Sequence, residues 1–476
     1  MRVGIVAGPF LALCTLAGCA SSIRSAATSA NPSARAALVA RIDSLIGAFL
    51  STTPASSAAV AVVQGADTIV MRGYGLSDRA AGRLATPNTV YQIASITKQI
   101  TAAAIMRLVD QGKLRLEDDV SKHLPAVSLH GRRVTVRQLV NHTSGIPNFT
   151  SKPGWRALWA EDLTPDRLVG LVARDSFDFE PGARYSYNNT GYTMLGMIIE
   201  RVSGKPYWQF FADEFFTPLG LTRTRYCPPP AERDSTFAVG YSVTNNTFEP
   251  AQYISRTHPN AAGAVCSTVR EYLVWQRALH EGRNVSPQSY QLMITPDTLN
   301  NGLPMTYGLG LFAETLGPRR MITHSGSISG FTTAQLYFPA ESLSVVIFTN
   351  TDMRGPEPTA LNVARAVFGM PLVSRVPRPP AVALAPADRD RLLGQYDLVR
   401  PDGRLLPLRI FLTGETLIAE AEGIGPRATP LVHYGSDTFA STLDPTLRLT
   451  FTRENGAVTG VRIVHWGTTF AGRRRP

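Results

Sequence analysis

The stretch Ser95-Ile96-Thr97-Lys98 opens an apolar helical pattern that continues to Gln111 and stops at Gly112. It is the most informative stretch of the chain because it places a hydroxyl and an amine on one helix face, as residues i and i+3. A serine hydroxyl is a weak nucleophile at neutral pH, and a lysine desolvated beside it can act as its base. Ser95 is therefore predicted to be a nucleophile at a helix start, where the helix dipole favours an oxyanion.

The scarcity of lysine makes Lys98 more informative. Only five of the 47 basic residues are lysines, so arginine is the usual cation of this chain. Arginine cannot act as a base here, because its guanidinium stays protonated and is planar and forked. A Ser-x-x-Lys match still arises by chance roughly 0.3 times in a chain of this composition, so the motif needs support from elsewhere.

The first residues have the pattern of an export signal. Val3 to Leu16 is an apolar stretch too short for a stable membrane span, and it ends in Leu16-Ala17-Gly18-Cys19, which resembles a bacterial lipobox. We therefore predict a lipoprotein signal peptide over residues 1–18, lipidation of Cys19 and a flexible tether over 19–35. The alternative is a plain secretory signal cleaved near Ala20. Either form predicts an exported protein, and the first predicts a lipid anchor on a membrane in the bacterial periplasm.

Export affects the interpretation of the cysteines, because an oxidising compartment permits disulfides. Cys14 would be removed with the signal peptide, which leaves Cys227 and Cys266 as a single possible pair. We predict that they form a disulfide. The alternative is two buried thiols.

The net charge of +11 does not predict a nucleic-acid partner. The arginines are scattered, and the only dense run, Arg473 to Arg475, has no interleaved aromatic residues. No histidine, cysteine or carboxylate has a partner at metal-ligand spacing, so the sequence predicts no metal and no cofactor. We give no expectation for the oligomeric state.

The distribution of helix and strand patterns predicts an α+β domain over residues 36–373. A helix (36–50) and a hairpin (57–64 and 68–74) come first, and a last helix (357–368) follows strand patterns at 306–312, 321–324, 332–338 and 343–350. Between them lie mostly helical segments: 136–141, 165–174, 190–202, 207–216 and 269–280. The expected fold is one antiparallel sheet flanked by helices, with an inserted helical lobe.

A second, smaller unit follows this domain. Residues 374–390 are rich in proline, with Pro377, Pro379 and Pro380 close together, and are expected to form a linker. Residues 391–476 show short alternating runs, which predict a small all-β accessory domain.

Two further motifs support the assignment of Ser95 and Lys98. These are Tyr187-Asn188-Asn189 and His324-Ser325-Gly326, and two flanking stretches accompany them, Tyr91 to Ala94 and Leu139 to Ile146. In this order and spacing, the motifs resemble the active site of the penicillin-recognising serine hydrolases, the family of class C β-lactamases, DD-peptidases, D-aminopeptidases and related esterases. The resemblance covers roughly residues 42 to 369 and implies a β-lactamase/transpeptidase-like fold.

The resemblance also implies a role for each matching residue. Ser95 would attack a carbonyl while Lys98 and Tyr187 handle its proton, and Tyr187 could act as a phenolate if Lys98 and its surroundings lower its pKa. The backbone N–H groups of Ser95 and Ser327 would form the oxyanion hole. Asn189 would bind the substrate's amide, and the strand His324-Ser325-Gly326 would bind the substrate along its edge.

Taken singly, the supporting motifs have simpler interpretations. Tyr187-x-Asn189 is typical of a turn before a helix, with Asn189 as the N-cap. His324 alone would more often be a hydrogen-bonded residue on a half-buried strand. His142 has no partner at metal spacing and is interpreted as structural.

His324 shifts the expected substrate, because many β-lactamases carry lysine at the matching position. An imidazole offers less fixed positive charge to a substrate carboxylate than an ammonium does. We therefore predict an exported serine hydrolase that cleaves amide or peptide bonds of small molecules or peptides containing D-amino acids, of the DD-carboxypeptidase or D-aminopeptidase type. An esterase or weak β-lactamase is the alternative within the family, and a non-catalytic cell-envelope binding protein is the alternative outside it.

Overall fold

A computed structural model of the chain describes residue 1 and residues 32–475, apart from 54, 245–246, 303, 353–354, 374–380, 400–404, 422–427, 442–446 and 466–467. The predicted signal peptide, Cys19 and nearly all of the predicted tether lie outside these residues. Most of the proline-rich stretch of the predicted linker does too. Among the helices within the described ranges, none is long and apolar enough to cross a membrane.

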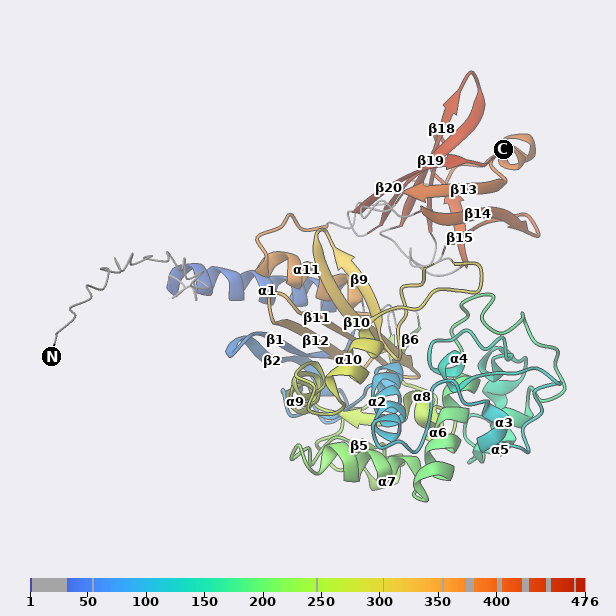
Figure 1. Cartoon of the computed structure of the whole chain (residues 1–476). Coiled ribbons are helices and arrows are strands. Elements are labelled where there is room, and N and C mark those ends of the chain that lie inside the picture. Colours follow the sequence, from blue (N-terminus) through green and yellow to red (C-terminus); the bar gives the residue numbers. More distant parts are fainter. Residues whose placement is uncertain are drawn as a thin grey trace.

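The first part of the chain forms an antiparallel sheet with the strand order β3-β2-β1-β12-β11-β10-β9, which confirms the expected α+β fold (Figure 1). Strands from both ends of the domain meet at its centre, where β1 pairs with β12. The strands are β1 (Ser57–Gln64), β2 (Asp67–Asp78), β3 (Arg83–Leu84), β9 (Phe312–Leu316), β10 (Arg319–Ile328), β11 (Phe331–Phe338) and β12 (Leu343–Thr349).

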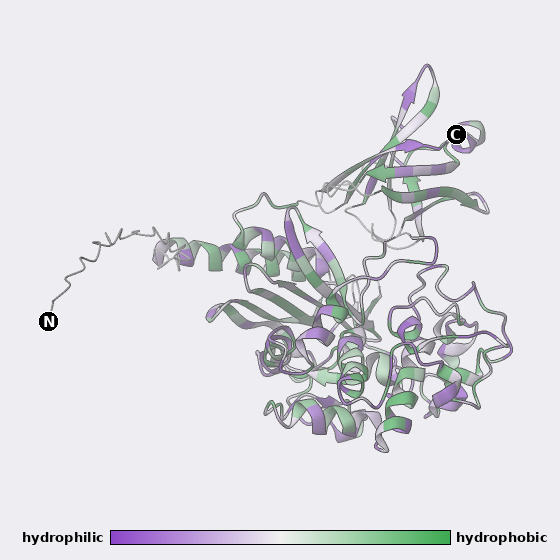
Figure 2. Ribbon diagram, in the orientation of Figure 1, coloured by the Kyte–Doolittle hydropathy of each residue, from purple (hydrophilic) through white to green (hydrophobic). Residues whose placement is uncertain are grey.

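Alternating side chains of β1 supply both faces of this sheet, as the two-residue period of a strand requires. Ala58, Val60 and Val62 pack with the flanking helices α1 (Pro32–Thr52) and α11 (Glu357–Val367). Ala59 and Ala61 belong to the larger core, which contains helix α2 (Thr97–Asp110) and the helical lobe. Because both faces are covered, β1 and β12 are mostly apolar (Figure 2).

The helical lobe is inserted between β3 and β9 and carries the residues that follow the nucleophile motif. Its helices are α3 (Val120–His123), α4 (Val136–Val140), α5 (Pro165–Gly170), α6 (Asn189–Ser203), α7 (Tyr207–Phe211), α8 (Asn260–Gly263), α9 (Val269–His280) and α10 (Pro287–Ile294). Its short strands are β4 (Tyr91–Gln92), β5 (Arg225–Tyr226), β6 (Tyr241–Thr244), β7 (Thr247–Pro250) and β8 (Val265–Ser267). Helix α10 has no counterpart among the segments expected from the sequence.

One strand prediction is wrong. Residues 306–312 alternate apolar and small residues, but β9 begins only at Phe312. Tyr307, Leu309 and Leu311 instead lie in a buried loop. This loop depends on its glycines, since Gly310 has a φ of +77° and its Cβ would lie 2.8 Å from the carbonyl oxygen of Lys98.

The last part of the chain is a closed antiparallel barrel of eight strands, which confirms the expected all-β unit (Figure 1). Its core contains Tyr396, Leu408, Leu449 and Phe451. A short helix, α12 (Pro386–Asp390), precedes the barrel inside the expected linker. The strands are β13 (Gly394–Val399), β14 (Leu405–Thr413), β15 (Thr416–Ala421), β16 (Ala428–His433), β17 (Thr438–Ser441), β18 (Arg448–Glu454), β19 (Ala457–His465) and β20 (Thr468–Arg474).

Cys227 and Cys266 form a disulfide with their Cα atoms 5.1 Å apart. Both are buried against Val90 and Phe237, and Cys266 lies on β8, which pairs with β4 just before the nucleophile turn. The bridge therefore joins the 227 loop to the segment that supports Ser95.

We expect replacement of both cysteines by alanine to lower the free energy of unfolding by about 2–4 kcal/mol, because a disulfide restricts the unfolded chain. Urea unfolding of the wild type and of Cys227→Ala/Cys266→Ala, without reductant, measures the difference. Reductant should lower the stability of the wild type and leave that of the double variant unchanged. Equal stability of the two proteins without reductant would contradict the prediction.

Candidate active site

The nucleophile lies on a short turn between two packed elements. Ser95 is the middle residue of a 3₁₀ turn, Ala94–Ile96, that leads directly into α2. Ser95 thus precedes the α-helix by two residues, slightly earlier than the sequence pattern predicted. Ala94 has a φ of +47°, a left-handed conformation that is rare for a non-glycine residue and is typical of functional turns.

Hydrogen bonds on both sides hold this turn in place. The backbone N–H of Ile93 donates to the carbonyl oxygen of Val265 at 3.0 Å. The Thr333 hydroxyl of β11 donates to the carbonyl oxygen of Ile93 at 3.1 Å. The position of Ser95 is therefore set by the central sheet and by the disulfide-linked strand β8.

Lys98 is fully buried one turn after Ser95. Its Nζ lies 3.1 Å from Ser95 Oγ, 2.9 Å from Asn189 Oδ1 and 2.9 Å from the carbonyl oxygen of Ala262. Two of these partners can only accept a hydrogen bond, whereas the serine hydroxyl can also donate one. No carboxylate is among the partners of Lys98 within the described part of the chain.

An ammonium on Lys98 would donate to all three partners, and a neutral amine would donate to Asn189 and Ala262 and accept from the Ser95 hydroxyl. Burial lowers the pKa of Lys98 well below its ordinary value of 10.5, which favours the neutral form. Lys98 is thus positioned to remove the Ser95 proton.

Tyr187 lies on the other side of Lys98. The Lys98 amine is 4.7 Å from the centre of the Tyr187 ring, and the Tyr187 hydroxyl is hydrogen-bonded with Ser95. Burial raises the pKa of Tyr187, and the hydrogen bond with Ser95 only partly opposes this effect. The condition for a phenolate, a lowered pKa of Tyr187, is therefore not met, and the structure favours a neutral phenol that can donate a proton.

Asn189 links Lys98 to the lobe. Its Oδ1 accepts from Lys98, and its Nδ2 donates to Thr150 Oγ1 at 3.2 Å. The second N–H of this amide remains for a substrate carbonyl, because Asn189 lines the cavity beside Ser95. The N-cap of α6 is Asn188, whose side chain accepts from the Gly191 N–H, so the N-cap interpretation of Asn189 is wrong.

His324 is buried and does not line the cavity, so its expected contact with substrate is wrong. Its Nδ1 must donate to the carbonyl oxygen of Ser325, at 2.7 Å, since a carbonyl only accepts. Its Nε2 therefore accepts from the Tyr307 hydroxyl at 3.2 Å. Burial lowers the pKa of His324 to about 3, so this residue provides no positive charge for a substrate carboxylate.

Gly326 has a packing role in place of the expected substrate contact. A Cβ at this position would lie 2.3 Å from the carbonyl oxygen of Ile93 and 3.1 Å from the Ala94 Cβ. Glycine therefore lets β10 pass directly over the nucleophile turn. Neither Gly326 nor Ser325 lines the cavity.

Ser327 lies in the same cavity as the nucleophile. It is exposed on β10. β9 pairs with β10 only as far as Thr323, so β9 does not cover Ser327. This placement agrees with a hole formed by the backbone N–H groups of Ser95 and Ser327.

The cavity beside Ser95 has a volume of about 590 Å³, in the range of small-molecule sites. The lobe contributes Trp155, Arg156 and Trp159 to its wall, and Asp352 comes from the chain just after β12. None of these four residues was predicted from the sequence. No local motif marks them, because they meet only when the lobe folds against the sheet.

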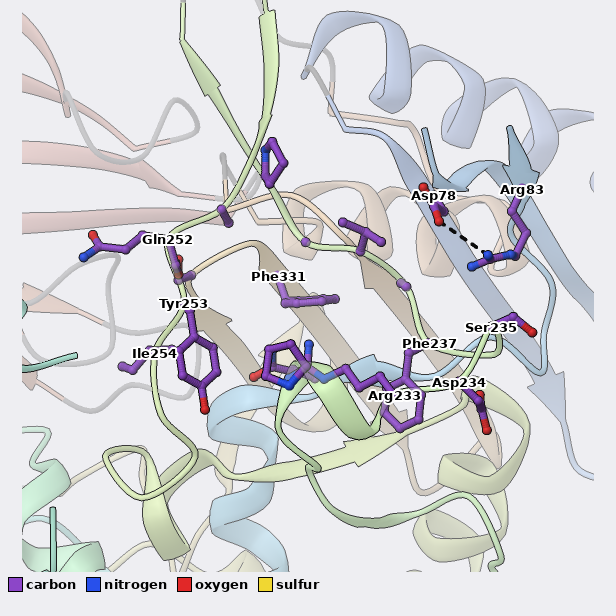
Figure 3. Close-up of a pocket in the computed structure, with 18 residues that line it drawn as sticks. Asp78, Arg83, Arg233, Asp234, Ser235, Phe237, Gln252, Tyr253, Ile254 and Phe331 are labelled. Atoms are coloured by element: carbon purple, nitrogen blue, oxygen red, sulfur yellow. Dashed lines mark hydrogen bonds and ion pairs between the residues drawn. The ribbon is translucent and has the colours of Figure 1, made fainter. Parts of the chain in front are cut away.

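A second cavity of about 410 Å³ adjoins the first (Figure 3). Gln252, Ile254 and Ser329 line both cavities. Arg233 and Phe331 belong to the wall of the second cavity only. The segment from Gln252 to Ile254 thus lies between the two cavities.

His142 supports the Tyr187 segment, in agreement with its structural interpretation. It is buried, its Nδ1 accepts from the Asn188 N–H at 3.0 Å, and its ring centre is 4.4 Å from that of Tyr187. The rings of Tyr192 and Tyr307 also pack on it. His142 therefore positions both Tyr187 and Asn189 without facing the substrate.

Comparisons with known proteins agree with this geometry. The Beta-lactamase family description matches residues 42–369. Penicillin-binding protein 4* of Bacillus subtilis is 28% identical over 360 residues, which are 71% of this chain and 78% of that protein. D-aminopeptidase of Brucella suis is 26% identical over 316 residues, and the match spans 66% of this chain but only 60% of the aminopeptidase.

Solved structures show the same fold. A D-stereospecific amidohydrolase from Streptomyces sp. has a TM-score of 0.59 and 26% identity, covering 71% of this chain and 99% of that one. The octameric penicillin-binding protein homologue from Pyrococcus abyssi has a TM-score of 0.65 and 24% identity, and it covers 91% of this chain and 99% of its own. That likeness extends into the barrel. The chain, with Ser95, Lys98 and Tyr187 brought together, is a serine hydrolase that belongs to the beta-lactamase family.

Proposed function

We propose that the protein hydrolyses amide bonds of D-amino-acid derivatives through an acyl-enzyme on Ser95. The observation that carries this proposal is the set of Lys98 contacts, two to acceptors and one to the Ser95 hydroxyl. A base of this kind activates a serine without any carboxylate.

The proposed proton path uses these contacts and the hydrogen bond between Tyr187 and Ser95. Lys98 removes the proton as Ser95 Oγ attacks the substrate carbonyl, and the oxyanion forms between the N–H groups of Ser95 and Ser327. The ammonium on Lys98 is then stabilised by Asn189 Oδ1 and the Ala262 carbonyl. As the C–N bond breaks, the leaving amine takes a proton from Tyr187, which recovers one from Lys98. Water then attacks the acyl-enzyme while Lys98 takes its proton, and Lys98 returns this proton to Ser95 Oγ as the C–O bond breaks and the acid is released.

Two features favour amides of D-amino acids over β-lactams. His324, on β10, is neutral and buried, so it offers no fixed cation to a β-lactam carboxylate. Relatives named as a D-aminopeptidase and a D-stereospecific amidohydrolase share the fold and 26% of aligned residues. Both act on D-amino-acid compounds according to their names.

A substrate panel tests the proposal. D-phenylalanine amide, L-phenylalanine amide, a D-Ala-D-Ala peptide, 4-nitrophenyl acetate and a chromogenic cephalosporin are compared with purified wild type and Ser95→Ala. We expect the highest kcat/KM for the D-amide, and no turnover of it by Ser95→Ala. Faster turnover of the cephalosporin or the L-amide by the wild type would overturn the proposed substrate class.

We also propose that the mature protein is exported and attached to a membrane through lipid on Cys19. The lipobox-like sequence supports this, and the Cys227–Cys266 disulfide fits an oxidising compartment. Cys19 lies outside the described residues, so this proposal rests on the sequence.

We expect Cys19→Ser to move the protein from the membrane fraction to the soluble fraction, since one acylated cysteine supplies the anchor. Fractionation of cells expressing each form, followed by immunoblotting, gives the measurement. Cys14→Ser is the matched control and should leave the protein with the membranes. If the wild type is already soluble, the lipid anchor is wrong.

A further inference from the structure

The cavity beside Ser95 combines an aromatic wall with one fixed carboxylate. Trp155 and Trp159 line it from the lobe, and their ring centres are 5.4 Å apart. Asp352 lines it together with Ser242 and Ser329. An aromatic surface and a carboxylate in one small cavity fit a ligand that has both an apolar side chain and a positive charge.

Asp352 is held in position by two donors. Its Oδ2 accepts from the Ser242 hydroxyl at 2.5 Å and from the Gly330 backbone N–H at 3.2 Å. Gly330 has a φ of +79°, and a Cβ there would lie 2.8 Å from the Gly240 Cα, so this donor needs glycine. Within the described ranges, Oδ1 accepts no hydrogen bond and Asp352 has no ion pair. A rigid carboxylate with one oxygen unused is able to accept from a ligand.

The other ionisable groups of the cavity have different roles. The Arg156 guanidinium lies over the Trp159 ring at 5.0 Å. The Trp155 indole N–H donates to Nδ1 of His258 at 3.2 Å, so Nε2 of that histidine donates to the Glu161 carbonyl at 2.9 Å. His258 is thus a neutral wall residue. Asp352 is the one anionic side chain among the residues described around this cavity.

The sheet places Asp352 near the acyl side of the reaction centre. Thr349, at the end of β12, pairs with Thr332, which follows the β10–β11 turn. Asp352 therefore lies at the end of β10 where Ser327 forms the oxyanion hole and Ser329 lines the same cavity. A substrate bound at Ser95 would therefore share this cavity with Asp352.

We propose that Asp352 binds a protonated amino group on the acyl part of the substrate, while Trp155 and Trp159 contact its side chain. The inference rests on the proposed function and narrows it to amides and peptides with a free amino terminus. Such a contact is a charge-assisted hydrogen bond, which raises both affinity and selectivity. N-acylated substrates lack the positive charge and leave the carboxylate unpaired.

The test compares D-phenylalanine 4-nitroanilide with its N-acetyl and N-succinyl derivatives. We expect wild type to favour the free amine over the N-acetyl compound by roughly 10- to 100-fold in kcat/KM. Asp352→Asn should bring this ratio close to one, and Asp352→Glu should recover part of it. The ratio should also fall as the pH rises above about 8, where a free α-amino group loses its proton. Asp67→Asn, on β2, is the matched control and should keep the wild-type ratio.

The outcomes separate the inference from the proposed function. Equal rates for the free and N-acetyl substrates on wild type, with a covalent phosphonate adduct on Ser95, would overturn the role of Asp352 and leave the hydrolase intact. A preference for the N-succinyl substrate would indicate that Arg156 binds the substrate's carboxylate, and it would also overturn the role of Asp352. No hydrolysis and no adduct would remove the proposed function, and the inference with it. Circular dichroism and the melting temperature verify that each variant is folded.

Discussion

Lys98→Arg is expected to lower kcat/KM by about 10³-fold, within the range by which a positioned base accelerates a reaction. Lys98 acts as a neutral amine that accepts the Ser95 proton, whereas an arginine stays protonated and can only donate. The site is also fully buried, so the larger guanidinium has no room. Steady-state kinetics with the best substrate of the panel measure the loss.

The pH dependence of kcat/KM distinguishes the loss of a catalytic base from a distortion of the active site by the larger side chain. Burial lowers the pKa of Lys98, so the wild-type kcat/KM should rise with pH through that lowered pKa and level off above it. The kcat/KM of Lys98→Arg should not rise with pH over the same range. Lys113→Arg, at an exposed position, is the matched control and should keep wild-type kinetics. Activity of Lys98→Arg within tenfold of wild type would show that another group is the base.

Gly326→Ala is expected to reduce kcat by about 10²- to 10³-fold, comparable to the loss of one oxyanion donor. The added methyl group would collide with the Ile93 carbonyl oxygen and with Ala94, both of which are part of the turn that carries Ser95. Either β10 or the turn must move, and then the N–H groups of Ser95 and Ser327 no longer converge. We also expect stability to fall by about 1–3 kcal/mol, as for other overpacked positions.

A second glycine provides the control for this prediction. Gly47 lies on the exposed side of α1, and a Cβ there meets nothing within 4 Å. Gly47→Ala should keep full activity and gain stability by up to about 1 kcal/mol, the helix propensity difference. Kinetics and thermal melts of both variants measure the two effects. Wild-type kcat in Gly326→Ala would show that the packing of β10 on the turn is unimportant for catalysis.

The catalytic centre was predictable because its residues are local signals. Ser95 and Lys98 share one helix face, and Tyr187 and Asn189 are two residues apart before a helix. The sheet was predictable for a similar reason, since β1, β11 and β12 are apolar runs bounded by turn residues. These signals depend on neighbours in the sequence and need no knowledge of the tertiary structure.

The orientation and partners of other residues depend on tertiary contacts. His324 lies on β10 and is buried, and its ring nitrogen Nε2 accepts a hydrogen bond from the Tyr307 hydroxyl. Tyr307 belongs to a loop whose alternating residues resemble a strand in the sequence. A phenolate at Tyr187 required Lys98 and the surroundings to lower its pKa, but the burial that lowers the pKa of Lys98 also raises that of the phenol. Asp352 and Trp155 belong to segments far apart in the sequence, so no motif connects them.

Covalent labelling of Ser95 is the most direct measurement of the central claim, that this residue is a nucleophile activated by a neutral Lys98. The protein is treated with a fluorophosphonate at neutral pH, and the adduct is located by mass spectrometry of its peptides. We expect one adduct, on the peptide that contains Ser95, absent from Ser95→Ala and formed much more slowly in Lys98→Arg. An adduct on another residue, or one that persists in Ser95→Ala, would contradict the account.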